Sequence, residues 1–187
     1  GLGGVVLLTA LLVTTVWALV FYETNRRANG LFISLFITGL GIAVSMIHVL
    51  PRPHLFTYLC TVLWVVSLEQ ITSSRPQRWW ILPLLMLFWV NLHGMFVLGI
   101  IIWGIYLVGS LLENPTRSWI TDRTSKALLL GGLSSIIATF FSPSGLHIWE
   151  AITSLGSNAY ITSRIPEYQS ANFHMPETWP FVLLLIL

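Results

Sequence analysis

Polar side chains that could bind a ligand occur at two interruptions of an otherwise apolar sequence. Arg52 and His54 flank a proline between two apolar runs, and Asn91 and His93 precede a glycine in the middle of another run. Arginine presents a fork of hydrogen-bond donors that suits a phosphate or pyrophosphate group. The first interruption therefore indicates phosphate binding, and the second indicates a pocket for a polar ligand.

Each interruption also has a simpler explanation. An arginine at the end of an apolar span can extend its stem so that the charge reaches lipid headgroups. Asn91 and His93 can satisfy backbone groups where a helix turn opens. The residue types alone leave both explanations open.

A third group of polar residues follows Pro166, and Glu167 is its acidic member. Its carboxylate could act as a general base, a metal ligand or a hydroxyl acceptor. His147 and Glu150 have a spacing that could share a divalent cation, but no further ligand lies close in sequence. The single cysteine, Cys60, excludes an internal disulfide and a cysteine-based zinc site. We identify no cofactor and no metal site, and a divalent-metal requirement stays open.

The composition places these residues in a membrane protein. Of 187 residues, 55% are hydrophobic and 9% are charged, against about 25% charged in a soluble domain. So few charges cannot cover a soluble fold, which excludes soluble globular, disordered and coiled-coil proteins. The nine basic residues are spread over the whole length, so nucleic acid is not an expected partner. The expected partner is membrane lipid.

Apolar runs separated by short polar joints predict an all-α polytopic transmembrane helix bundle with about seven membrane segments. Proline and glycine in the joints end the helices. The expected segments lie near 2–22, 31–50, 55–72, 79–90, 95–112, 127–142 and 179–187, the last continuing past the end of the chain.

The stretch 79–112 needs a break at Asn91–Gly94. One helix over this stretch would be about 51 Å long, well beyond the roughly 30 Å of a bilayer core. With the break, seven of the nine Lys and Arg residues fall on one side, and only Arg52 and Arg164 fall on the other. Without the break, five Lys and Arg residues fall on one side and four on the other. The positive-inside tendency therefore favours the break.

The face opposite the basic loops is expected to carry the polar turns and a long polar segment. Four apolar residues recur at helical spacing, namely Ile148, Trp149, Ile152 and Leu155. This pattern predicts an amphipathic helix over 144–158 lying in the membrane interface. An irregular outer loop is expected over 160–178, long enough to suggest a function.

Both ends of the sequence have the character of cuts within a longer chain. The first residue is Gly1 rather than methionine, and an apolar run stops after seven residues at Leu187. We therefore expect residues 1–187 to be a single transmembrane domain that is truncated at both ends.

Four short motifs follow one another along the chain, namely Arg52-Pro53-His54-Leu55-Phe56, Trp89-Val90-Asn91-Leu92-His93-Gly94, Ser142-Pro143-Ser144-Gly145-Leu146 and Pro166-Glu167-Tyr168-Gln169-Ser170. Their order resembles a family of bacterial polytopic membrane proteins similar to the GT-C class of glycosyltransferases. The likeness covers about 48–187, and its most specific element is Trp-x-Asn-x-His-Gly. Relatives would carry Asn-Pro-x-Gly in place of the third motif's Ser-Pro-Ser-Gly and Glu-Trp-Gln-Ser in place of the fourth motif's Glu-Tyr-Gln-Ser.

The resemblance implies a glycosyltransferase-like protein of the bacterial inner membrane, with a polyprenyl-phosphate sugar as donor at the outer face. The acidic catalytic residue of that class is expected upstream of Gly1, so none is assigned here. By the resemblance Arg52 would bind the phosphate, with His54 and His93 as neighbouring donors. Asn91 would orient the site, and Glu167 would contact the sugar or the acceptor.

Two other functions are compatible with the sequence. A non-catalytic accessory or structural subunit would pack its polar side chains against other protein subunits of a membrane complex. A transporter of a lipid-linked substrate would more often show broken helices in two repeats, whereas a single broken segment is expected here.

The predicted topology can be tested by labelling single cysteines in a Cys60→Ser background. An impermeant thiol reagent added outside should label a cysteine at position 172 and leave one at position 74 unlabelled. Equal labelling would contradict the topology. The residues expected inside are Arg26, Arg75 and Arg123, and those expected outside are His54, His93 and Asn172.

Overall fold

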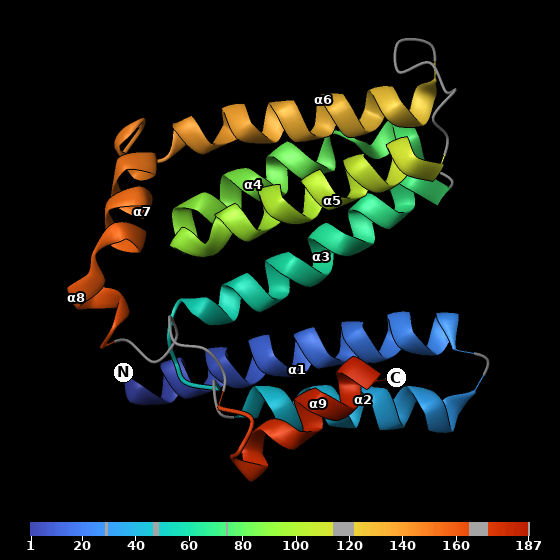
Figure 1. Cartoon of the computed structure of the whole chain (residues 1–187), viewed down its shortest axis with the longest axis vertical. Helices are drawn as coiled ribbons and strands as arrows, with labels where there is room; N and C mark the ends of the chain where they lie inside the picture. Colours follow the sequence, from blue (N-terminus) through green and yellow to red (C-terminus); the bar gives the residue numbers. More distant parts are fainter. Residues whose placement is uncertain (29, 47–48, 74, 114–121, 165–171, 187) are drawn as a thin grey trace. The chain divides into compact units, whose positions relative to one another are not determined.

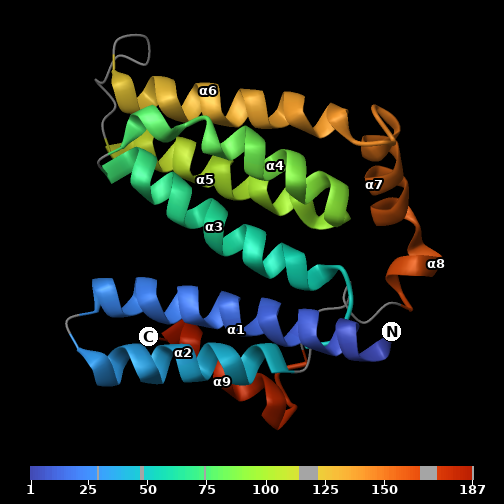
Figure 2. The ribbon, with the colours of Figure 1, turned by 180° about the vertical axis from the view of Figure 1, so that it is seen from behind.

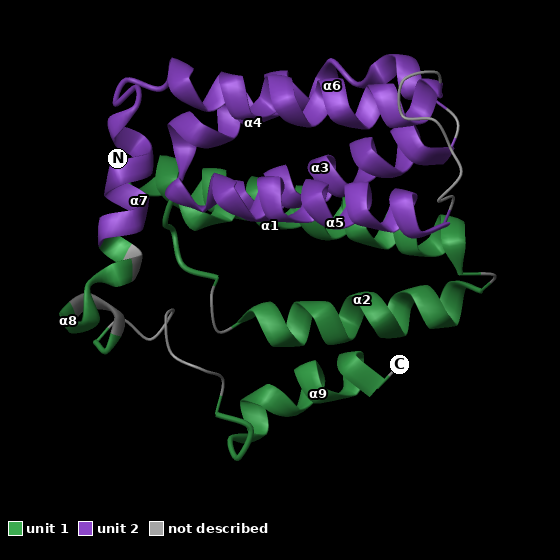
Figure 3. Ribbon diagram, turned by 45° about the horizontal axis from the view of Figure 1, so that its top comes forward, with its two compact units in different colours: residues 1–55, 155–187 green, residues 56–154 purple. Residues whose placement is uncertain are grey.

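The computed structural model describes the whole chain except residues 29, 47–48, 74, 114–121, 165–171 and 187. Within the described residues the regular elements are helices and short 3-10 turns, and no strand occurs (Figure 1). These residues form two compact units, Gly1–Leu55 with Leu155–Leu187 and Phe56–Ser154 (Figure 3). The all-α prediction is therefore confirmed for this part of the chain.

Among the described residues, four helical segments are long and apolar enough to cross a membrane, which supports the membrane class. Two further apolar segments, Leu31–Ser45 and Pro176–Ile186, are shorter than the roughly 17–25 residues that a span needs. The predicted count of about seven membrane segments is therefore not confirmed. The four long segments are Leu2–Arg27, His54–Ser73, Gly94–Glu113 and Arg123–Phe141.

The first unit is built around α2 (Leu31–Ser45), which contacts both α1 (Leu2–Arg27) and α9 (Trp179–Ile186). An added Cβ at Gly41 would lie 2.8 Å from the Trp17 ring, so this glycine lets α1 and α2 approach closely. The unit also holds α8 (Ala159–Thr162) and the 3-10 turn η6 (Pro176–Thr178).

Two boundaries in this unit differ from those expected. Helix α1 continues past residue 22 because its last turns carry ion pairs, with Glu23 2.8 Å from Arg26 and 3.5 Å from Arg27. Charged pairs three and four residues apart stabilise a helix end. Helix α2 ends at Ser45 rather than near residue 50, so it has only 15 residues.

The second unit is a bundle of α3 (His54–Ser73), α4 (Ile81–Leu92), α5 (Val97–Glu113) and α6 (Arg123–Ala138). The four helices lie side by side, as the two opposite views show (Figures 1 and 2). Their core contains large side chains with no solvent exposure, namely Trp64, Leu68, Ile71, Leu82, Met86, Trp89, Phe96 and Leu128.

The expected break is present between α4 and α5. Helix α4 ends at Leu92, and His93 has an extended backbone with φ −159° and ψ 141°. The chain then enters the 3-10 turn η3 (Gly94–Phe96), which leads directly into α5. Helix α4 begins at Ile81 rather than at residue 79, because the turn η2 (Pro76–Arg78) precedes it.

Helix α6 packs closely on two neighbours because it carries two consecutive glycines. An added Cβ at Gly131 would lie 2.7 Å from a Leu82 methyl, and one at Gly132 would lie 1.8 Å from the Trp103 ring. The Trp103 indole N–H also donates to the Leu128 carbonyl at 2.8 Å. Gly131 therefore lets α4 pack closely on α6, and Gly132 lets the Trp103 indole of α5 pack closely on α6.

The amphipathic helix is α7 (His147–Ser157), and residues 147–154 belong to the second unit. Its apolar side chains Ile148, Trp149 and Ile152 pack against the core. The Trp149 indole donates to the Thr139 hydroxyl at 3.1 Å and meets Phe96 edge to face. This stripe covers one end of the bundle, although Leu155, expected in the same stripe, is 44% exposed.

The close fit at Gly132 predicts the effect of adding one methyl group. Gly132→Ala should destabilise the protein, because overpacking typically costs about 1–3 kcal/mol and the Trp103 ring would have to move. The matched control is Gly104→Ala, where an added Cβ meets no atom within 4 Å. The control should gain up to about 1 kcal/mol from helix propensity. Unfolding in detergent, followed by tryptophan fluorescence, measures both, and equal midpoints would contradict the packing.

Candidate functional site

Three polar side chains form a hydrogen-bonded chain at the helix break. His93 Nδ1 lies 2.9 Å from the Thr57 hydroxyl, and the Trp89 indole N–H donates to the same hydroxyl at 3.1 Å. Thr57 is 6% exposed and Trp89 is fully buried, whereas His93 is half-buried. The break therefore holds a histidine ring at the edge of the core, tied to the first turn of α3.

Thr57 can hold His93 in either protonation state. Its oxygen already accepts the Trp89 N–H, and its own proton can be donated to Nδ1 of a neutral imidazole. If the imidazole is protonated, Nδ1–H becomes the donor and the Thr57 oxygen accepts a second hydrogen bond. The ring can keep one orientation while its charge changes, which suits a group that binds an anion or moves a proton.

The face of α3 that carries Thr57 has further unused polar atoms. Trp64 meets Trp89 edge to face, with ring centroids 6.1 Å apart. Among the described residues, the Trp64 indole N–H and the Thr61 hydroxyl are buried without a hydrogen-bond partner. Polar atoms of this kind are uncommon in a packed interior, so this face is more polar in character than its apolar neighbours.

Asn91 is used differently from the expectation. Its side chain is exposed, and its amide donates to the Leu87 carbonyl one turn earlier at 2.7 Å. Leu87 lies four residues before Asn91 within α4, so this side-chain hydrogen bond stays within its own helix. The structure thus gives Asn91 the simpler role of closing the helix end, next to a His93 that bonds to another helix.

Arg52 and His54 lie in the turn that leads into α3. The Arg52 amide donates to the Leu50 carbonyl at 2.7 Å, and the Arg52 carbonyl accepts the Leu55 amide at 3.2 Å. Arg52 is exposed, and His54, the first residue of α3, is half-buried. Both belong to the first unit, whose first segment ends at Leu55, whereas Asn91 and His93 belong to the second.

The remaining candidates add no metal site. Glu167 lies outside the described residues. His147 and Glu150 form an exposed ion pair with 2.8 Å between Nδ1 and Oε2. Among the residues that the structure describes, no three His, Cys, Asp or Glu side chains gather closely enough to hold a metal ion.

Sequence reasoning missed two polar contacts between helices. Thr57 carries no sequence signal, because a threonine in an apolar run is ordinary. Glu69 does carry one, since a carboxylate within a membrane span is costly and usually has a partner. Its partner is Tyr106 on α5, whose hydroxyl donates to Glu69 at 2.5 Å across 37 residues of sequence.

Comparisons with known proteins add no assignment. No family model, curated protein or solved structure matches this chain. Function is therefore inferred from its residues and their contacts.

Thr57 provides a direct test of the hydrogen-bonded chain. Thr57→Val keeps the shape but leaves the buried Trp89 N–H without its acceptor, which should cost about 1–3 kcal/mol. Thr61→Val, one turn along α3, removes a hydroxyl that has no described partner and should be nearly neutral. Unfolding midpoints of the two variants in detergent give the comparison. Equal midpoints would show that the Thr57 hydroxyl holds neither ring.

Proposed function

We propose that this chain is the membrane-embedded part of a glycosyltransferase-like protein that takes a polyprenyl-phosphate sugar at the outer face of a bacterial inner membrane. The observation that carries the proposal is the half-buried His93, anchored by Thr57 where α4 is interrupted. In this proposal the shorter helices α2, α4 and α9 also enter the membrane and bring the number of membrane segments to about seven.

The chemistry of the break suits a phosphate at a membrane boundary. An interrupted helix exposes backbone groups that must find polar partners. An imidazole with a fixed ring plane can donate to a phosphate oxygen as a cation or as a neutral donor. The fully buried Trp89 keeps the Thr57 end of this network away from water, so the His93 ring is positioned before any ligand arrives.

The contacts also give the Trp-x-Asn-x-His-Gly element a physical meaning. Trp89 bonds Thr57, Asn91 closes the last turn of α4, His93 leaves the helix and bonds Thr57, and Gly94 starts the next turn. The four residues act together in making one break and presenting one ring. The glycosyltransferase proposal rests on the resemblance that this element carries.

The remaining roles follow from charge and position. Arg52 binds the donor phosphate with His54, His93 supplies a further hydrogen-bond donor, and Glu167 contacts the sugar or the acceptor. Asn91 orients the site by fixing the end of α4. No residue among 1–187 is assigned as the base that activates the acceptor hydroxyl.

One observation favours the accessory-subunit alternative. The Asn91 side-chain amide donates its hydrogen bond within its own helix. This is expected in a protein that needs a stable helix end and binds no ligand there. The two functions differ in whether the chain binds a polyprenyl phosphate, so donor binding distinguishes them.

Arg52→Ala should weaken binding of polyprenyl phosphate to the detergent-solubilised chain. Loss of a charge-assisted hydrogen bond costs about 1.5–3 kcal/mol, which corresponds to a loss of roughly tenfold to over a hundredfold in affinity. The Arg52 side chain is exposed, so the fold should be retained. Binding can be measured with radiolabelled polyprenyl phosphate.

The matched control is Arg164→Ala, which removes the other basic residue of the expected outer face. Arg164 lies over the Tyr160 ring, 3.9 Å from its centroid. Its replacement by alanine should leave the affinity for polyprenyl phosphate nearly unchanged. Unchanged affinity in Arg52→Ala would remove the phosphate role, and no binding to the unaltered chain would favour the accessory subunit.

A further inference from the structure

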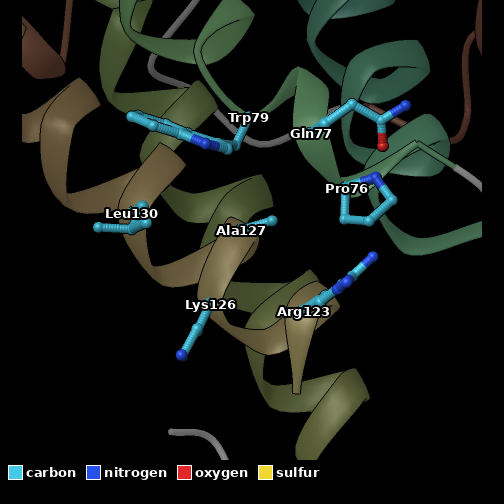
Figure 4. A pocket seen from close by; sticks show the side chains of 7 residues that line it. All are labelled: Pro76, Gln77, Trp79, Arg123, Lys126, Ala127 and Leu130. Atoms are coloured by element: carbon cyan, nitrogen blue, oxygen red, sulfur yellow. The ribbon is translucent and has the colours of Figure 1, made fainter. Parts of the chain in front are cut away.

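A pocket of about 350 Å³ lies at the end of the second unit where α4 and α6 begin. It is formed between the turn η2, the residues that follow it and the first turns of α6 (Figure 4). Trp79 precedes α4 and His93 follows it, so the pocket and the helix break lie at opposite ends of this helix. The pocket is lined by Pro76, Gln77, Trp79, Arg123, Lys126, Ala127 and Leu130.

The polar lining of the pocket is cationic. Arg123 and Lys126 are exposed, and Gln77 adds an amide, while no carboxylate is among the lining residues. Figure 4 shows Arg123 extending toward Pro76 and Gln77. The nearby Asp122 carboxylate accepts the Ser125 amide at 2.7 Å as the cap of α6. Two positive charges and an amide donor suit an anion such as a phosphodiester.

The other side of the pocket is apolar and continues along α6. Arg123, Lys126, Leu130, Leu133 and Ile137 recur at intervals of three and four residues, so they share one face of the helix. The three apolar members are 50%, 53% and 58% exposed. One helix face therefore has a cationic head followed by an exposed apolar strip, which is the complement of an anionic amphiphile.

The wall beside this face is fixed by close packing. Trp79 is half-buried, and its carbonyl would lie 3.2 Å from a Cβ added at Gly131. The backbone at Trp79 is thus held against α6, and its side chain packs on the core and lines the pocket. Tryptophan suits the boundary between headgroups and acyl chains, so the pocket has the polarity gradient of a membrane surface.

We propose that this pocket binds the headgroup of an anionic phospholipid, with the phosphate at Arg123 beside Gln77, Lys126 adding positive charge from the same helix face, and an acyl chain along Leu130, Leu133 and Ile137. Basic pockets between membrane helices on the side that carries the positive loops are a known way of recognising such lipids. This site is separate from His93 and does not depend on the proposed glycosyltransferase function.

The test measures lipid binding to the detergent-solubilised 187-residue chain by native mass spectrometry. Phosphatidylglycerol and phosphatidylcholine with identical acyl chains are titrated separately. The unaltered chain should bind phosphatidylglycerol more tightly than phosphatidylcholine. The double variant Arg123→Gln/Lys126→Gln should lower the affinity for phosphatidylglycerol by about tenfold to thirtyfold. Binding of phosphatidylcholine should change little, because its headgroup carries no net charge.

The matched control is Arg26→Gln/Arg27→Gln, which removes the same charge from the last turn of α1, where both arginines pair with Glu23. It should retain the preference. Equal loss in both double variants would overturn the site and leave only a general attraction to positive charge. An absent preference in the unaltered chain would also overturn it.

A second variant separates a lipid from a free anion. Leu130→Gln keeps both charges but interrupts the apolar strip, so it should weaken phosphatidylglycerol several-fold. Inorganic phosphate should compete poorly, because it lacks the acyl chain. Full competition by inorganic phosphate, together with an unchanged Leu130→Gln, would show a free-anion site and overturn the lipid proposal.

Discussion

The second unit depends on the absence of side chains at two consecutive positions of α6. Gly131 accepts Leu82 and the backbone at Trp79, and Gly132 accepts the Trp103 ring at a distance that no Cβ could tolerate. The Trp103 N–H then bonds a carbonyl of α6 itself. Leu82 belongs to α4 and Trp103 to α5. The two adjacent glycines therefore fix both helices against the same turn of α6. The pocket wall at one end of α6 and the Trp149 contact at the other follow from that arrangement.

Polar groups in this unit are segregated along the helices. Thr57 and His93 lie at the end where α4 is interrupted, and the basic residues of η2 and α6 lie at the end where it begins. Between them the core is apolar, apart from contacts such as the one from Tyr106 to Glu69 that joins α3 to α5. A membrane imposes this division, because polar groups within it need partners whereas those at its surfaces can meet headgroups and water.

The helices could be predicted from the sequence, since apolar runs and proline or glycine joints are local signals. The break at Asn91–Gly94 was predicted because one continuous helix would exceed the bilayer. The hydrogen-bond partner of the Asn91 side-chain amide could not be predicted. The amide can donate either to a ligand or to the Leu87 carbonyl of the same helix, and in the structure it donates to Leu87. Thr57 and His93 lie 36 residues apart, and their contact depends on how α3 packs against α4. Helix lengths were less certain, as α2 shows, because apolar composition alone does not fix where a helix stops.

The position of the two glycines has a consequence for how the protein is made. Their packing partners, Leu82 and Trp103, both precede them in the chain. Synthesis proceeds from the amino terminus, so α4 and α5 leave the ribosome before α6 does. Helix α6 is therefore made after both helices on which it packs. At Gly131 and Gly132 it has no side chain that would have to move when it packs on them. Assembly of this unit can follow the order of translation, with α6 packing onto α4 and α5 before α7 is added.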